Sequence, residues 1–265
     1  MRDAGRVVAL RRYLRTPKAQ FAVVLFLLTI IAANATGWAL VAPTLLGAIG
    51  VAMLLDAPLL WRRDSRWTFP DGAMLTGWIV ALVVSPHEPW YVAAVTAGVG
   101  VLSKYVWRVG RANVLNPAAF ALVATFYVFD TGQSWWGALP ELPLGWTLAL
   151  FATGVYTAIR LNKVPVILAF LAVFFTLATA AAFTVDPQKV AELFRAPDLH
   201  AALFFAFFMV TDPPTSPPKH RDQLWYGVIT AVVGYLVFQF IGAAYFLLAG
   251  LLAANVWEAW RKSHR

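Results

Sequence analysis

The chain has 265 residues, of which 60% are hydrophobic and 13% are charged. A soluble domain is about 45–50% apolar and about 25% charged, so this composition excludes an ordinary soluble globular protein and indicates an integral membrane protein. The net charge of +8 does not predict nucleic-acid binding, because the basic residues lie between apolar runs. The chain has no cysteine, so any redox role requires an organic cofactor or a partner's metal.

Apolar runs separated by polar breaks predict an all-α integral membrane protein with about ten transmembrane helices. The runs 71-85, 90-103 and 199-211 fall short of the roughly 20 residues that a straight span requires, so we expect tilted, broken or re-entrant helices there. The ten predicted spans lie near residues 20-35, 38-60, 71-85, 90-103, 116-130, 144-160, 164-184, 199-211, 224-240 and 242-258.

Basic residues occupy alternate loops of this prediction. Nineteen of the 21 Lys and Arg residues lie on one side, and only Lys189 and Arg195 lie on the other. Because basic loops stay in the cytoplasm, both termini are predicted to be cytoplasmic. The predicted organisation is a basic cytoplasmic tail (1-19), a single polytopic membrane domain (20-260, with halves of about 20-130 and 144-260) and a cytoplasmic C-terminal tail (261-265).

Tryptophans near the predicted span ends are typical of an interfacial belt, and we expect Trp135 and Trp136 to anchor an outer loop at the membrane surface. The four histidines lie singly in the sequence, without the pairing of a metal motif. No metal site is therefore predicted, and no catalytic residue is assigned.

The segment 113–119 places polar residues and a proline at the start of a predicted span. Asn116 is a suitable N-cap and Pro117 suits the first helical turn, so a simple well-capped helix start explains both residues. The alternative is that the exposed amides of this helix start face an anionic or carbonyl-bearing ligand.

The segment 208–218 contains four prolines within six residues after an apolar run. Asp212 is costly in hydrocarbon, so we expect it to face the bundle interior, an aqueous cavity or the cytoplasmic interface. It could alternatively cap a turn, since Asp-Pro favours turns. We expect this segment and the Asn116-Pro117 segment to line one cavity, because non-helical backbone within a membrane must be satisfied by protein or water.

Residues 71-86 and 198-217 resemble each other weakly, since each begins with polar residues, continues as an apolar run and ends at Ser-Pro. The first segment is predicted to run outward and the second inward. Two inverted five-helix repeats would produce this relationship.

Three stretches resemble the membrane-subunit family that includes RnfD of the ferredoxin:NAD oxidoreductase complex and NqrB of the sodium-pumping NADH:quinone oxidoreductase. They are DGAMLTGWIVALVVSPHEPWY, SKYVWRVGRANVLNPAAFALV and FFMVTDPPTSPPKHRDQLWYGVITAVVG, which occur in the family's order. The resemblance implies ten spans in two inverted halves, as also in urea transporters, and flavin in an electron-transfer route. The positions that match the family's motifs, and are candidates for cofactor binding, are Thr76, Gly77, Lys104, Asn116, Pro117, Thr211, Asp212, Thr215 and Ser216.

One family motif is missing. Flavin-carrying members have a Ser-Gly-Ala-Thr type motif in an external segment, and its last threonine holds FMN through a phosphoester bond. The nearest string here, residues 130–134, reads Asp-Thr-Gly-Gln-Ser, in a loop of only about 13 residues. The chain is therefore expected to be a trimmed paralogue without covalent FMN, able to hold riboflavin or FMN non-covalently.

The resemblance implies a subunit of the bacterial inner membrane that transfers electrons together with partner redox subunits. At most, this chain is the membrane subunit of an oxidoreductase or electron-transport complex. A small-molecule channel or permease of urea-transporter-like architecture is an alternative, with the broken helices lining a path at the midplane. A structural assembly subunit without a site of its own is a third possibility.

Overall fold

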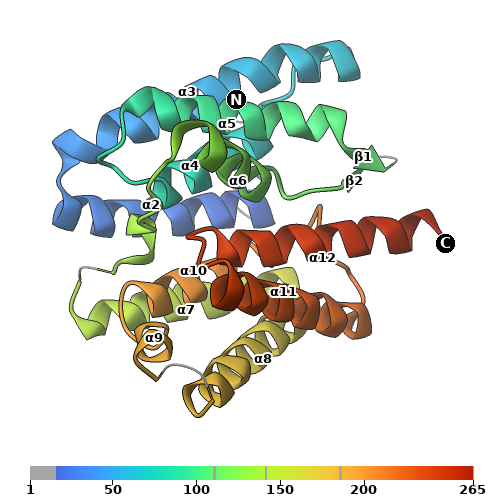
Figure 1. Ribbon diagram of the computed structural model, residues 1–265. Coiled ribbons are helices and arrows are strands. Elements are labelled where there is room, and N and C mark those ends of the chain that lie inside the picture. The colour runs from blue at the N-terminus through green and yellow to red at the C-terminus, as the bar shows by residue number, and fades with distance from the viewer. Residues whose placement is uncertain (1–15, 110–111, 141, 185–186, 265) are drawn as a thin grey trace.

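The computed structural model describes residues 16–109, 112–140, 142–184 and 187–264, and helices dominate it (Figure 1). Each of the ten predicted apolar runs overlaps one helix, and the short helix α9 adds a turn in the predicted outer loop. The predicted all-α class is confirmed for this part of the chain. The elements are α2 (Pro17–Thr36), α3 (Trp38–Asp64), α4 (Asp71–Val83), α5 (Trp90–Val106), β1 (Arg108–Val109), β2 (Ala112–Asn113), α6 (Pro117–Phe129), η1 (Trp136–Ala138), α7 (Leu144–Leu161), α8 (Val164–Ala182), α9 (Pro187–Glu192), α10 (Asp198–Phe208), α11 (His220–Phe240) and α12 (Phe246–Ser263).

Helix length differs widely along the bundle. Within the described ranges, four helices are long and apolar enough to cross a membrane: α2, α3, α8 and α11. The helices α4 and α6 have 13 residues each and α10 has 11. At 1.5 Å per residue, 13 residues extend about 20 Å, which is less than the hydrocarbon core of about 30 Å. These lengths agree with the short or broken helices expected at 71-85 and 199-211.

The predicted tails are only partly described. Residues 1–15 of the expected N-terminal tail lie outside the described residues, as do Arg111, Asp186 and Arg265. Pro17 begins α2, and the Thr16 side chain accepts a hydrogen bond from the amide of Ala19 at 3.3 Å. At the other end, α12 continues to Ser263, so most of the expected C-terminal tail is helical.

The helices gather in two groups (Figure 1). Helices α3–α6 lie in one half of the molecule and α7–α11 in the other, with α2 and α12 between them. Glycines allow close approach within each group. A Cβ on Gly77 of α4 would lie 2.6 Å from the carbonyl oxygen of Ala48 on α3, and a Cβ on Gly227 of α11 would lie 2.6 Å from the carbonyl oxygen of Val166 on α8. Small residues at such contacts are typical of helix packing in membranes.

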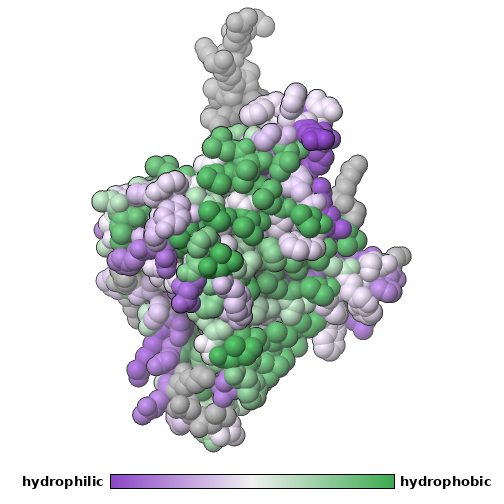
Figure 2. All heavy atoms as spheres, turned by 45° about the horizontal axis from the view of Figure 1, so that its top comes forward, coloured by the Kyte–Doolittle hydropathy of each residue, from purple (hydrophilic) through white to green (hydrophobic). Residues whose placement is uncertain are grey.

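The surface is rich in exposed apolar side chains. Leu54, Leu148 and Phe183 are 71–85% exposed, and Figure 2 shows a broad hydrophobic area with hydrophilic residues gathered at its margins. A soluble monomer rarely exposes so large an apolar patch, whereas lipid tails cover it without cost. The surface therefore supports an integral membrane protein.

The loop that joins the two halves turns into the protein. Trp135 and Trp136 are only 6% and 4% exposed. The indole Nε1 of Trp136 donates to the carbonyl oxygen of Ala81 at 2.6 Å, and the ring of Trp135 lies edge-on to Phe204. The expectation that these tryptophans anchor the loop at the membrane interface is wrong. Burial of both rings, together with an internal acceptor for one N–H, favours the inward path.

Candidate functional site

A cavity of about 970 Å³ lies where the two groups of helices meet. Its wall combines buried residues with exposed charged residues that form an outer rim. The lining residues are Thr16, Pro17, Lys18, Phe21, Asp56, Leu60, Arg63, Thr68, Phe69, Asp71, Gly72, Leu75, Thr76, Ile79, Lys104, Tyr105, Arg108, Asn113, Asn116, Pro117, Ala118, Arg160, Leu161, Phe208, Thr211, Asp212, Pro213 and Pro214.

The cavity brings together most of the residues selected from the sequence. The six that line it are Thr76, Lys104, Asn116, Pro117, Thr211 and Asp212. Gly77 instead packs against α3, and Thr215 and Ser216 lie just behind Asp212. The expectation that the Asn116-Pro117 and Asp212-Pro213 segments line one cavity is therefore confirmed. A cofactor-binding role for these residues stays a prediction.

Asn116 fixes the start of α6 at the cavity wall. Its side-chain oxygen accepts a hydrogen bond from the amide of Ala119 at 3.0 Å, as expected of an N-cap followed by Pro117. The backbone N–H of Asn116 donates to the side-chain oxygen of Asn255 on α12 at 2.7 Å. The capped helix start and the cavity lining therefore occur together, so the two interpretations of this segment are compatible.

Asp212 organises the proline-rich turn after α10. Its Oδ2 accepts a hydrogen bond from the hydroxyl of Thr215 at 2.8 Å. Its backbone oxygen accepts from the amide and the hydroxyl of Ser216, at 2.9 Å and 2.7 Å. The hydroxyl of Thr211 donates to the carbonyl oxygen of Phe207 at 2.7 Å. These bonds replace the helical bonds that the prolines remove and hold the Asp212 carboxylate at the cavity.

A buried chain of polar side chains connects the two cavity-lining segments. The amide Nδ2 of Asn255 donates to the hydroxyl of Tyr226. Tyr226 also interacts electrostatically with Thr215, whose hydroxyl donates to Asp212. Tyr226 and Asn255 are fully buried. The side-chain oxygen of Asn255 also accepts from the backbone N–H of Asn116. The buried polar chain therefore runs from the start of α6 to the Asp212 carboxylate.

Lys163, between α7 and α8, supports the same turn from behind. Its ammonium group donates to the carbonyl oxygen of Pro217 at 2.8 Å and to that of Ser216 at 3.3 Å. The side chain is 4% exposed. Burial lowers the pKa of Lys163 to about 8, although the charge of Asp212 opposes the decrease. Lys163 therefore positions the turn without lining the cavity.

Most charged groups of the cavity have partners within the protein. Lys18 forms an ion pair with Asp71 at 2.8 Å, and the Asp56 carboxylate accepts from the hydroxyl of Tyr105 at 2.8 Å. Lys104 differs, because its ammonium group makes no hydrogen bond or ion pair with any residue that the structure describes. Lys104 lines the cavity together with Asp212.

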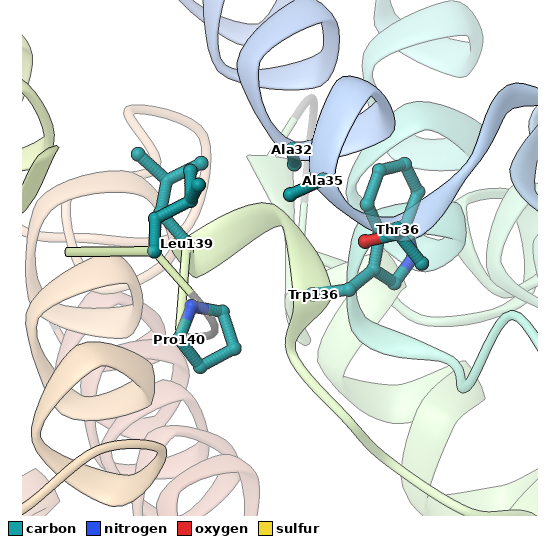
Figure 3. Close-up of a pocket in the computed structure, with 7 residues that line it drawn as sticks. Ala32, Ala35, Thr36, Trp136, Leu139 and Pro140 are labelled. Atoms are coloured by element: carbon teal, nitrogen blue, oxygen red, sulfur yellow. The ribbon is translucent and has the colours of Figure 1, made fainter.

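A second, much smaller pocket lies between the end of α2 and η1 (Figure 3). Ala32, Thr36, Trp136 and Leu139 are among the residues that line it, and its volume is about 10 Å³. That space admits at most about one water molecule, so it offers no room for an organic ligand. Among the described residues, no group of three His, Asp or Glu side chains is arranged to hold a metal ion.

Three residues of this arrangement were not predicted from the sequence: Lys163, Tyr226 and Asn255. Asn255 carries a usable signal, since a polar amide within an apolar run of a membrane protein is costly unless it has a partner. Tyr226 and Lys163 occur where aromatic and basic residues are ordinary, near predicted span ends, and their positions give no comparable signal.

A family model matches the second half of the chain, and individual relatives match shorter parts of it. Residues 145–258 match the model of the NQR2, RnfD, RnfE family. The RnfD subunit of the ion-translocating oxidoreductase complex of Stutzerimonas stutzeri is 38% identical over 85 residues, which are 31% of this chain and 23% of that protein. The RnfD subunit from Vibrio vulnificus (strain YJ016) is 29% identical over 120 residues, 43% of this chain and 33% of that protein. The aligned regions thus span 23–33% of the length of these relatives, and the resemblance noted in the sequence is confirmed.

Proposed function

We propose that this protein is an electron-transfer membrane subunit of an ion-translocating oxidoreductase-type complex, and that its cavity holds a flavin non-covalently. The observation that carries the proposal is the cavity itself, since it lies where the three family-like stretches converge. A flavin supplies one- and two-electron redox chemistry. The chain, which has no cysteine, supplies none of this chemistry from its own thiols.

The size and lining of the cavity suit a flavin. Small-molecule sites commonly have volumes of about 300–1,000 Å³ and a mostly apolar wall with a few placed polar groups. The apolar side chains of Phe21, Leu75 and Phe208 can cover the faces of an aromatic ring system, whereas Lys104 and Asp212 can bind its polar edge. The protein's part is therefore to bind and orient the ring and to exclude water from it.

We further propose that no flavin is attached covalently. The hydroxyl-bearing side chain of Thr131 is 2% exposed, and the hydroxyl of Ser134 is buried without a hydrogen-bond partner among the described residues. Attachment to either would require a transferring enzyme to reach a hydroxyl inside the folded loop. The absence of the Ser-Gly-Ala-Thr motif and the burial of these hydroxyls support the same conclusion.

The proposed architecture is ten spans in two inverted five-helix repeats in the bacterial inner membrane, with both termini in the cytoplasm. Corresponding helix pairs pack in both halves, since α3 packs along α5 and α8 along α11, while α5 contacts α6 and α11 contacts α12. The described basic residues at the cavity rim, including Lys18, Arg63 and Arg160, all belong to the predicted cytoplasmic side. The cavity would then open toward the cytoplasm.

We also propose that this subunit works with partner redox subunits. The relatives named above are subunits of a complex. A flavin in a single cavity can only pass electrons if a donor and an acceptor approach it, and this chain has no cysteine to hold an iron–sulfur cluster of its own.

An optical spectrum of the full-length protein, purified in detergent from flavin-replete cells, tests the proposal. We expect flavin absorption that solvent extraction releases, and a denaturing gel without a fluorescent band at 29 kDa. Ala118→Leu fills the cavity and should reduce the bound flavin, whereas the control Ala124→Leu, on the same helix but outside the cavity, should not. Gel filtration of each variant reports whether it is folded.

A colourless wild-type protein would contradict the flavin proposal and favour the channel alternative. A fluorescent band on the denaturing gel would contradict the non-covalent mode of binding alone.

A further inference from the structure

Two groups at the cavity have hydrogen-bonding capacity that the described part of the protein does not use. The Oδ2 atom of Asp212 accepts from Thr215 at 2.8 Å, but its Oδ1 atom has no hydrogen-bond partner among the described residues. The ammonium group of Lys104 has none either. No ion pair joins Asp212 to Lys104, although each lies close enough to influence the charge of the other.

The Asp212 carboxylate is held by the Thr215 hydroxyl, which belongs to the buried polar chain. The ammonium group of Lys104 lies beside Gly72 of α4, since a Cβ at that glycine would be in van der Waals contact with Nζ at 3.9 Å, and both residues line the cavity. An acceptor and a donor that line one cavity, each with unused hydrogen-bonding capacity among the described residues, favour a ligand edge that presents a donor and an acceptor side by side.

We propose that Asp212 and Lys104 bind the imide edge of the ligand, with Asp212 accepting its ring N–H and Lys104 donating to an adjacent carbonyl oxygen. This inference rests on the proposed function, because the pyrimidine ring of a flavin carries an N3–H between two carbonyl groups. A quinone or a phosphate presents acceptors alone and would leave the Asp212 oxygen unpaired. A buried charged acceptor without a partner is costly, so such ligands are disfavoured.

The test compares riboflavin with 3-methylriboflavin, which lacks the N3–H. Full-length protein in detergent, freed of bound flavin, is titrated with each ligand, and quenching of flavin fluorescence gives the dissociation constants. We expect the wild type to bind riboflavin at least tenfold more tightly than the methylated ligand. In Asp212→Ala that ratio should fall toward one, because the group that distinguishes the two ligands is gone.

Control variants separate this role from general effects on the fold. Asp130→Asn removes the charge of an exposed aspartate that does not line the cavity, and it should preserve the wild-type ratio. Lys104→Met should weaken the binding of both ligands by a similar factor and leave their ratio unchanged, while Arg62→Met, on the same predicted side, should change neither. If Asp212→Ala does not fold, the inference is still tested by the wild-type ratio of the two dissociation constants and by the affinities of Lys104→Met.

The possible outcomes are distinct. Equal affinity of the wild type for both flavins overturns this inference and leaves the proposed function standing. If the wild type does not bind riboflavin but binds a quinone such as decylubiquinone, both this inference and the proposed function are overturned.

Discussion

The two buried hydrogen bonds of Asn255 predict a large effect for Asn255→Leu. Asn255 is fully buried, and its side chain accepts from the Asn116 amide at 2.7 Å while donating to the Tyr226 hydroxyl. Leucine has a similar size but neither accepts nor donates. The substitution therefore leaves the Asn116 amide without an acceptor at the start of α6.

The structure sets the magnitude of this effect. A buried donor left without a partner costs about 1–3 kcal/mol in the free energy of unfolding. In a chain of about this size, each kcal/mol shifts the melting temperature by about 2–4 °C. We therefore expect Asn255→Leu to melt about 2–12 °C below the wild type, with weaker retention of the proposed flavin, because the Asn116-Pro117 segment loses its attachment to α12.

Thermal unfolding of the detergent-purified protein, followed by tryptophan fluorescence, measures the shift. Asn34→Leu is the matched control, since Asn34 accepts one hydrogen bond, from the Trp38 indole at 2.9 Å, at an exposed position. Water can replace that bond, so the free energy of unfolding of the control should decrease by less than about 1 kcal/mol. An unchanged melting temperature for Asn255→Leu, or a decrease no larger than that of the control, would refute the reasoning.

Three further outcomes follow from the structure. Gly77→Ala should destabilise the protein by about 1–3 kcal/mol in thermal unfolding, because the added methyl group would lie 2.6 Å from the Ala48 carbonyl oxygen. Because burial lowers the pKa of Lys163 from 10.5 to about 8, the unfolded chain binds more protons between these pH values. The wild type should therefore gain stability relative to Lys163→Met as the pH rises from 8 to 10.5, and a difference in melting temperature that stays constant with pH would contradict this. Finally, His220→Cys should react with a membrane-impermeant maleimide in inverted vesicles but not in intact spheroplasts, and labelling from outside would overturn the predicted topology.

Local sequence patterns predicted much of the helical fold. Apolar runs mark the helices because a helix in lipid must be apolar along its length, and the Asn116-Pro117 pair marks the start of α6 because capping depends on neighbouring residues alone. The resemblance also identified six residues that line the cavity. Each of these signals is contained within a short stretch of the chain.

The features that local patterns did not predict depend on distant partners. Asn255 meets Asn116 across 139 positions of the sequence, and Trp136 finds its acceptor 55 positions away in α4. The tryptophans of the joining loop have the composition of an interfacial anchor, and only the packing of α4 and α10 against them favours the buried arrangement. Gly77 lies next to Thr76 in the motif, but one helical step turns it away from the cavity and toward α3.

The position of the cavity also limits how far function can be transferred from the relatives. Phe208, Thr211 and Asp212 lie within residues 145–258, which the family model matches, whereas Lys104 and Asn116 lie outside that match. The buried chain through Tyr226 and Asn255 joins these two parts, so a ligand held by Asp212 and Lys104 would contact both halves of the protein at once. Loss of Asn255 should for this reason weaken binding without removing any group that contacts the ligand. A binding defect in Asn255→Leu that adds fully to the defect of Asp212→Ala would indicate that the chain does not transmit its effect through Asp212.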